Sequence, residues 1–197
     1  MKNTLSLLTI LLLFATTLRA ETGADPDRRH YNQLLLGGGS SIKGFGETDQ
    51  EVRTVDVLWR HARIFREKET GWLRGNHEFW IEAPVSIILS DSDNMDSNDF
   101  GMVGLNFLFA WVFPETPVGS PYFMIGGGPQ YILADIEGVG SDLCGNYQMG
   151  CGLRFNVAEQ HPVNLEIRYH HISNLGMAEP NVPLNSVKVF IGATLPF

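Results

Sequence analysis

Apolar and polar residues alternate with a period of two along several long stretches of this chain. Between residues 146 and 157 the apolar side chains occupy every second position: Tyr147, Met149, Cys151, Leu153, Phe155 and Val157. The positions between them hold glycine, asparagine, glutamine and arginine. Residues 79–89, 103–113 and 187–197 show a similar alternation. Because successive side chains of a β-strand point to opposite faces, this pattern predicts strands with one apolar face.

Eight such segments can be placed along the chain, at about 31–40, 50–65, 76–90, 99–114, 121–134, 145–157, 163–174 and 186–197. They are longer than ordinary globular strands of about 5–6 residues, and they suit the roughly 9–11 residues of a membrane-spanning strand. An even number of antiparallel strands can close on itself and leave no unpaired edge in a bilayer. The pattern therefore predicts an all-β protein, an eight-stranded antiparallel transmembrane β-barrel.

The N-terminal segment 1–20 has the pattern of a secretory signal peptide. Lys2 begins a short polar head, Leu5 to Phe14 is an almost unbroken apolar run, and the segment ends on the small residue Ala20. The apolar run is short of the roughly 20 residues that a spanning helix needs. We expect cleavage after residue 20 and a single barrel domain over 21–197, with an uncleaved N-terminal anchor as the alternative.

The alternation does not say which face of the barrel is inside. A lipocalin-like soluble barrel would turn its apolar face inward, and a membrane barrel would turn it outward to lipid. The signal peptide, the strand length and the terminal aromatic Phe197, which resembles the end signal of bacterial outer-membrane barrels, favour the membrane version. An eight-stranded barrel is just wide enough for side chains to fill it. Glycine, asparagine, glutamine and a few charges on the inner face then predict a filled polar interior and no pore.

The charge of the mature chain excludes one class of partner. Without Lys2 and Arg19, it has 12 basic and 22 acidic side chains, a net charge of −10. This balance argues against a nucleic-acid partner. The acidic segment 90–99 lacks the glycine and the glutamate of a calcium loop, and a solvated loop is expected there.

Two side chains near the end of segment 163–174 form a candidate catalytic pair, His171 and Ser173. They continue the apolar row of Leu165, Ile167 and Tyr169, whereas Asn164, Glu166, Arg168 and His170 lie on the other face. Placing a histidine and a serine among lipid tails costs free energy, so their presence there indicates a function. Their spacing lets the imidazole take the hydroxyl proton, which activates a serine nucleophile. Alternatively, the strand has simply left the bilayer at this point. Since His170 and His171 point to opposite faces, a shared metal site is not expected.

The residues around this pair carry a resemblance to a known family. The motif "HISN" at 171–174, the glycine at 176, "PN" at 180–181 and the final strand resemble the lipid A 3-O-deacylases, outer-membrane barrels of the acyloxyacyl hydrolase type. The resemblance implies a serine esterase site on the outer surface of a barrel in the bacterial outer membrane. The substrate it implies is the 3-O-linked acyl chain of lipid A in lipopolysaccharide, removed in the outer leaflet without a cofactor.

Carried over by position, the resemblance makes His171 the general base and Ser173 the nucleophile. It implies that the backbone amide of Asn174 and the side chain of Asn181 bind the oxyanion, which agrees with the donors that an ester carbonyl needs. One position departs from the family pattern. The acid of the triad is replaced by Asn185, whose neutral amide can orient an imidazole but cannot stabilise the imidazolium as a carboxylate does.

The missing acid leaves several alternatives open. Glu179 on the following loop is a candidate substitute acid. A weakened or inactive relative that serves as a structural or lipid-binding barrel, and a phospholipase that uses the same pair, are alternatives to the deacylase. The predicted partner is lipid A in the membrane, with a homodimer as an alternative to a single copy of the chain.

Overall fold

The computed structural model describes residues 29–42, 51–89, 101–136, 138–155 and 162–195, and its ordered elements are strands. They are β1 (His30–Ser41), β2 (Arg53–Lys68), β3 (Gly75–Ile88), β4 (Met102–Gly104), β5 (Asn106–Val112), β6 (Ser120–Ile132), β7 (Leu143–Phe155), β8 (Val163–Ser173) and β9 (Leu184–Thr194). In these ranges no helix is long and apolar enough to span a bilayer. The predicted signal peptide 1–20, the loop 90–99 and the terminal Phe197 lie outside the described residues.

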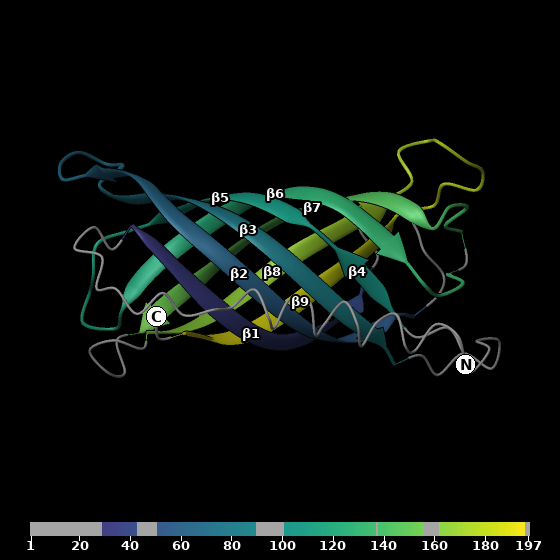
Figure 1. Ribbon diagram of the computed structural model, residues 1–197, viewed down its shortest axis with the longest axis horizontal. Coiled ribbons are helices and arrows are strands. Elements are labelled where there is room, and N and C mark those ends of the chain that lie inside the picture. The colour runs from purple at the N-terminus through teal and green to yellow at the C-terminus, as the bar shows by residue number, and fades with distance from the viewer. Residues whose placement is uncertain (1–28, 43–50, 90–100, 137, 156–161, 196–197) are drawn as a thin grey trace.

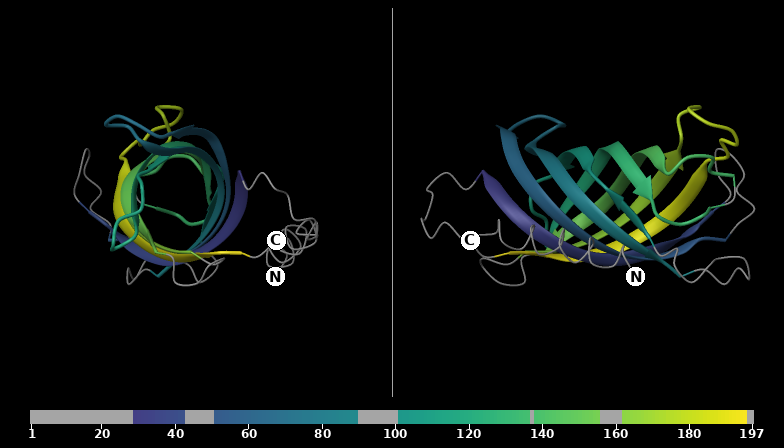
Figure 2. Two further views of the ribbon diagram at one scale, coloured as in Figure 1. Left: turned by 90° about the vertical axis from the view of Figure 1, so that its left-hand side faces the viewer. Right: turned by 45° about the vertical axis from the view of Figure 1, so that its right-hand side comes forward.

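The strands form one closed antiparallel barrel. Each strand pairs with its neighbours in sequence, and β1 pairs with β9 to complete the ring, which is seen end-on in Figure 2 and from the side in Figure 1. The short β4 and the longer β5 follow one another between β3 and β6, so they count as a single barrel strand. The predicted eight-stranded antiparallel barrel is confirmed.

The predicted strand 99–114 differs from the structure because it is interrupted at Leu105. The register does not shift there, but the residues beside the break include Pro84 on β3 and Pro129 on β6. A proline has no N–H to donate to the ladder, so the pairing is weakened on both sides of Leu105. The amide of Leu105 still donates to the carbonyl oxygen of Pro129, at 3.0 Å.

The apolar face of the barrel points outward. Phe109 and Ile191 on this face are 59% and 58% exposed, whereas Arg60 and Glu82 on the inner face are completely buried. A soluble barrel would show the reverse, since its apolar side chains would fill the interior. The side-chain arrangement thus agrees with a barrel whose outer surface contacts lipid.

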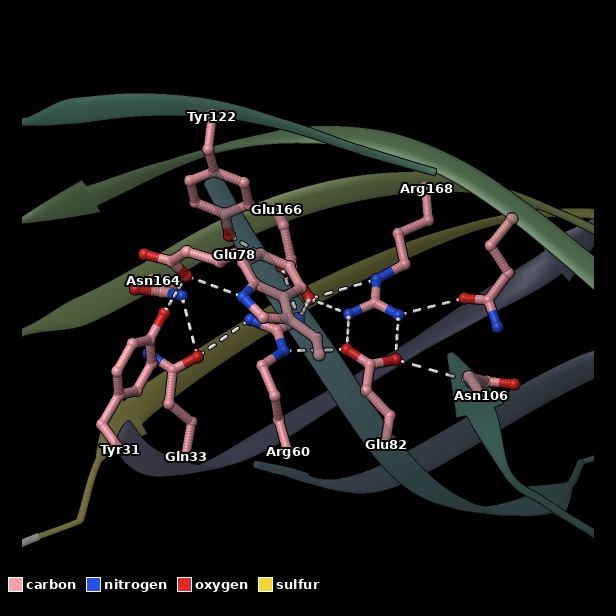
Figure 3. A network of polar contacts seen from close by, with 12 residues as sticks. Tyr31, Gln33, Arg60, Glu78, Glu82, Asn106, Tyr122, Asn164, Glu166 and Arg168 are labelled. Carbon is pink, nitrogen blue, oxygen red and sulfur yellow. Dashed lines mark hydrogen bonds and ion pairs between the residues drawn. The ribbon is translucent and has the colours of Figure 1, made fainter. Parts of the chain in front are cut away.

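The interior is filled by a network of buried charges (Figure 3). Arg60 donates to Glu82 at 2.8 Å and to Glu166 at 2.9 Å, and Arg168 donates to Glu82 at 2.8 Å. The two guanidinium groups and two carboxylates balance in charge, so each buried ion has an opposite partner. An apolar cluster closes each end of the interior: Val52, Ile88, Met102, Ile132, Ile136, Cys144, Ile172 and Leu184 at the end near loop 174–183, and Ala62, Trp80, Leu108, Ala110, Val112, Tyr122 and Met124 at the other. The predicted filled polar interior is confirmed.

Candidate active site

Strand β8 places His171 and Ser173 on the outer side of the barrel. Its residues alternate between exposed or half-buried positions, among them Leu165 and Ile167, and buried inward positions such as Glu166. His171 and Ser173 are among the outward-facing residues, and they lie at the end of β8, directly before loop 174–183. The structure therefore brings both predicted residues to one face and one end of the barrel.

Asn185 lies next to His171 on the neighbouring strand. The two residues oppose each other across the β8–β9 pair, and the Oδ1 atom of Asn185 is 2.7 Å from Nδ1 of His171. An amide oxygen can only accept, so the imidazole proton in this contact lies on Nδ1. In the neutral imidazole with its proton on Nδ1, the other ring nitrogen, Nε2, has no proton and can act as a base. Asn185 is completely buried although it lies on the outward side of the sheet.

Two tyrosines surround this histidine–asparagine contact, and the sequence pattern gave no role to either. The hydroxyl of Tyr169 donates to Oδ1 of Asn185 at 2.5 Å. The ring of Tyr147 packs against the imidazole of His171, with ring centroids 4.8 Å apart. The alternation places Tyr169 on the same face as His171, but only the pairing of β8 with β9 brings its hydroxyl to Asn185.

Ser173 is the last residue of β8 and directly opposes Gly145 on β7. Within the described part of the chain, His171 hydrogen bonds to Asn185 and not to Ser173. Catalytic hydrogen bonds in the absence of substrate are often long and tighten only when the substrate binds. The residue that faces the serine across the strand pair has no side chain, and the side chain of Leu175 lies over it, 3.0 Å from where a Cβ atom would be.

The loop after β8 holds the two predicted oxyanion residues together. The backbone N–H of Asn174 donates to Oδ1 of Asn181 at 3.1 Å. The Asn174 side chain is buried and ties the loop to itself, donating to the carbonyl oxygens of Ala178 at 2.8 Å and Pro180 at 3.1 Å. A ring of hydrogen bonds within the loop thus fixes the backbone amide beside Ser173.

Loop 174–183 is also anchored to the loop between β6 and β7. The amide of Gly140 donates to the carbonyl oxygen of Pro180 at 2.8 Å, and the amide of Val182 donates to that of Gly138 at 2.8 Å. Glu179 is exposed on the first of these loops and forms no ion pair with His171 among the described residues. The place beside Nδ1 that a substitute acid would need is taken by Asn185.

Across the described ranges, no group of three or more histidine, cysteine, aspartate or glutamate side chains is placed to hold a metal ion. A cavity of about 330 Å³ lies beside the end of β6, lined by Tyr131, Asp135 and Asp142 among others, and it does not include His171 or Ser173. The outward positions of His171 and Ser173 on β8 place the candidate site on the lateral surface of the barrel wall.

This fold and this site define a class: a membrane β-barrel with a histidine and a serine on its lipid-facing wall. A model of the family described as lipid A 3-O-deacylase (PagL) matches residues 53–194, from β2 to β9. The chain belongs to this family, and it is an outer-membrane β-barrel.

Solved structures give the same fold. The crystal structure of the outer membrane enzyme PagL is similar with a TM-score of 0.59 and 18% identity, covering 84% of this chain and 99% of that one. The crystal structure of Neisserial surface protein A (NspA) is similar with a TM-score of 0.55 and 12% identity, covering 85% of this chain and 97% of that one. No curated protein sequence matches the chain. At these identities the two structures support the architecture, and the chemistry has to be argued from the residues.

Proposed function

We propose that this chain is a lipid A deacylase, a serine esterase that removes the 3-O-linked acyl chain from lipid A of lipopolysaccharide. Membership of the deacylase family supports the substrate class. The observation that carries the proposal is the 2.7 Å contact between His171 Nδ1 and Asn185 Oδ1, on the lipid-facing side and two residues from Ser173. A histidine held through Nδ1 presents Nε2 as a general base, which is what a serine nucleophile requires.

In the proposed reaction, Oγ of Ser173 attacks the ester carbonyl carbon while Nε2 of His171 takes the hydroxyl proton. The backbone N–H of Asn174 and the side-chain amide of Asn181 bind the oxyanion. The N–H of Asn174 now donates to Asn181, so the substrate oxygen would replace that acceptor when it binds.

The tetrahedral intermediate then collapses and breaks the bond between the carbonyl carbon and the lipid A oxygen. His171 returns its proton to that oxygen, which leaves as the free 3-hydroxyl group of lipid A. A water molecule, activated by the same imidazole, hydrolyses the acyl-serine and releases the fatty acid. All of these steps use side chains and backbone of this chain together with water.

The position of the site on the barrel fits a substrate that stays in the membrane. Leu165 and Ile167 are exposed below His171 on the outward side of β8, and Leu175 and Met177 are exposed on the loop above it. Acyl chains of a neighbouring lipid can therefore lie along an apolar surface on both sides of the serine. Lipid A would enter the site sideways from the outer leaflet.

Expression of the chain in a Gram-negative host tests the proposal by mass spectrometry of lipid A. We expect the mass to fall by one 3-hydroxyacyl chain, and we expect Ser173→Ala and His171→Ala each to abolish this shift. The barrels of all variants should keep their heat-modifiable gel mobility, which shows that they are folded.

Two other results would contradict the proposal and indicate a different function. Unchanged lipid A in the presence of a folded, inserted barrel would indicate a structural or lipid-binding protein. Unchanged lipid A together with lysophospholipids that disappear in Ser173→Ala would indicate a phospholipase that uses the same pair.

A further inference from the structure

A single amide oxygen in the site accepts two hydrogen bonds. Oδ1 of Asn185 is 2.7 Å from Nδ1 of His171 and 2.5 Å from the hydroxyl of Tyr169. Tyr169 precedes His171 by two residues, so both side chains lie on the outward face of β8, and Asn185 lies across the strand pair from them. The three side chains form one unit at the lipid-facing edge of the β8–β9 pair.

A half turn of the side-chain amide of Asn185 changes which atom faces His171, whereas a half turn of a carboxylate exchanges two equivalent oxygens. The oxygen and nitrogen of an amide have nearly the same shape, and a half turn of the group exchanges them. In the exchanged state Nδ2 of Asn185 would donate to Nδ1 of His171, and the imidazole proton would move to Nε2. A histidine in that tautomer cannot take a proton from Ser173. A carboxylate has two equivalent acceptor oxygens, so either orientation keeps the imidazole proton on Nδ1.

We propose that Tyr169 is a positioning residue that holds the Asn185 amide with its oxygen toward His171. A phenol hydroxyl donates more readily than it accepts, because its lone pair is delocalised into the ring, so it favours the amide oxygen as partner. Asn185 is completely buried, which keeps water from supplying other partners. Tyr169 thereby allows an asparagine to work where the family pattern has an acid. This inference rests on the proposed function, because it assigns a role within the same site.

Kinetics of four full-length proteins in detergent micelles test the inference: the natural chain, Tyr169→Phe, Asn185→Asp and the double variant. We expect Tyr169→Phe to lower kcat about tenfold with KM unchanged, a change of about 1.4 kcal/mol that lies within the range of a net hydrogen bond. In the Asn185→Asp background the same substitution should lower kcat by less than about threefold, because a charge-assisted bond to either oxygen holds the imidazole. Equal losses in the two backgrounds, or no loss in the natural chain, would overturn the inference.

Tyr131→Phe is the matched control. It also removes a tyrosine hydroxyl that donates to a side-chain oxygen, here that of Asp142 at 3.2 Å. Tyr131 faces outward from β6, near the same end of the barrel. We expect its kcat and KM to equal those of the natural chain. A loss as large as that of Tyr169→Phe would show that the effect is general to this end of the barrel, and would also overturn the inference.

The imidazole tautomer gives a readout that does not need activity. In protein labelled with ¹⁵N-histidine, with the signal of His171 assigned from the spectrum of His171→Gln, we expect neutral His171 to carry its proton on Nδ1. Tyr169→Phe should add a population with the proton on Nε2, and the double variant should return it to Nδ1. An unchanged Nδ1–H tautomer in Tyr169→Phe would overturn the inference even if no deacylation were detected. Absent activity with the expected tautomer change would count against the proposed function alone.

Discussion

At the residue scale, Asn185 decides how strongly the histidine can act as a base. Its oxygen fixes the imidazole through Nδ1, but it adds no negative charge to stabilise the imidazolium that forms when Ser173 loses its proton. In serine proteases, the change from aspartate to asparagine in this role lowers kcat by about 10⁴ because the imidazole takes the wrong tautomer. Here the oxygen of Asn185 faces Nδ1 and favours the right tautomer, so the missing charge is what remains to limit the base. The site thus has the geometry of a catalytic triad in which Asn185 orients His171 but does not stabilise the positive charge of the imidazolium.

Restoring the carboxylate should raise the rate. We expect Asn185→Glu to increase kcat for lipid A deacylation at least about tenfold, because part of the imidazolium stabilisation returns. Initial rates measured by mass spectrometry of released fatty acid would show the gain. If Asn185→Glu gave no gain and Glu179→Ala abolished activity, Glu179 would be the acid and the assignment of Asn185 would be wrong.

Gly145 is the second residue whose identity matters for the serine. It faces Ser173 across the β7–β8 pair, and a Cβ atom on it would meet the side chain of Leu175 at 3.0 Å. We expect Gly145→Val to lower kcat/KM at least about tenfold, because a branched side chain would crowd the approach of the ester. Cys151→Val, on the same exposed face of β7 but farther from the serine, is the control and should leave kcat/KM unchanged. Equal values for both variants would remove Gly145 from the substrate path.

At the scale of elements, loop 174–183 and the loop between β6 and β7 support each other. Gly138 lies at the point of contact, with φ +85° and with space so tight that an added Cβ would lie 2.8 Å from Cβ of Val182. Glycine is therefore required there both by its backbone conformation and by the close approach of the neighbouring loop. The position of the proposed oxyanion amide depends on this contact.

Gly138→Ala should disturb the loop and leave the barrel intact. We expect kcat to fall roughly fivefold, since strain of about 1–2 kcal/mol is placed in the loop contact, while the urea midpoint of barrel unfolding stays the same. Gly71→Ala is the matched control, because Gly71 has φ +88° in the β2–β3 turn and an added Cβ there would approach no atom closer than 3.7 Å. Its activity should equal that of the natural chain. A similar loss in both variants would refute the role of the loop contact.

At the scale of the whole molecule, the charges inside the barrel hold distant strands together. Arg60 on β2 joins Glu166 on β8, 106 residues away along the chain, and both also contact the Glu82–Arg168 pair (Figure 3). Because all four side chains are completely buried, removing one leaves a partner unpaired in a place that water does not reach.

Arg60→Met should therefore destabilise the barrel by about 3–5 kcal/mol in the free energy of unfolding, measured by urea titration in micelles. Arg53→Met removes an arginine from an exposed ion pair with Glu51, at 2.7 Å, and should cost no more than about 1 kcal/mol. If the two substitutions cost the same, the interior network would not contribute to stability in the way its geometry indicates.

The periodicity of the sequence predicted the strand number, the closed barrel and which side chains share a face. With the signal-peptide pattern, the strand length and the terminal Phe197, the sequence also predicted that the apolar face points outward. It placed Glu166 and Arg168 inside and His171 and Ser173 outside, and the structure agrees in each case. The predicted strand ends are less accurate, and the interruption at Leu105 is not predicted, because it depends on prolines in the two neighbouring strands. The resemblance drew attention to Asn185, but nothing in the pattern indicated Tyr169.

By itself, the sequence determined the period of two and hence which side chains of each strand share a face. Only the tertiary structure decided the register between strands, which sets Asn185 opposite His171, Gly145 opposite Ser173 and Arg60 against Glu166. The physical reason is that alternation is a local property of one strand. Register follows from hydrogen bonds and side-chain packing between segments that are far apart in the chain.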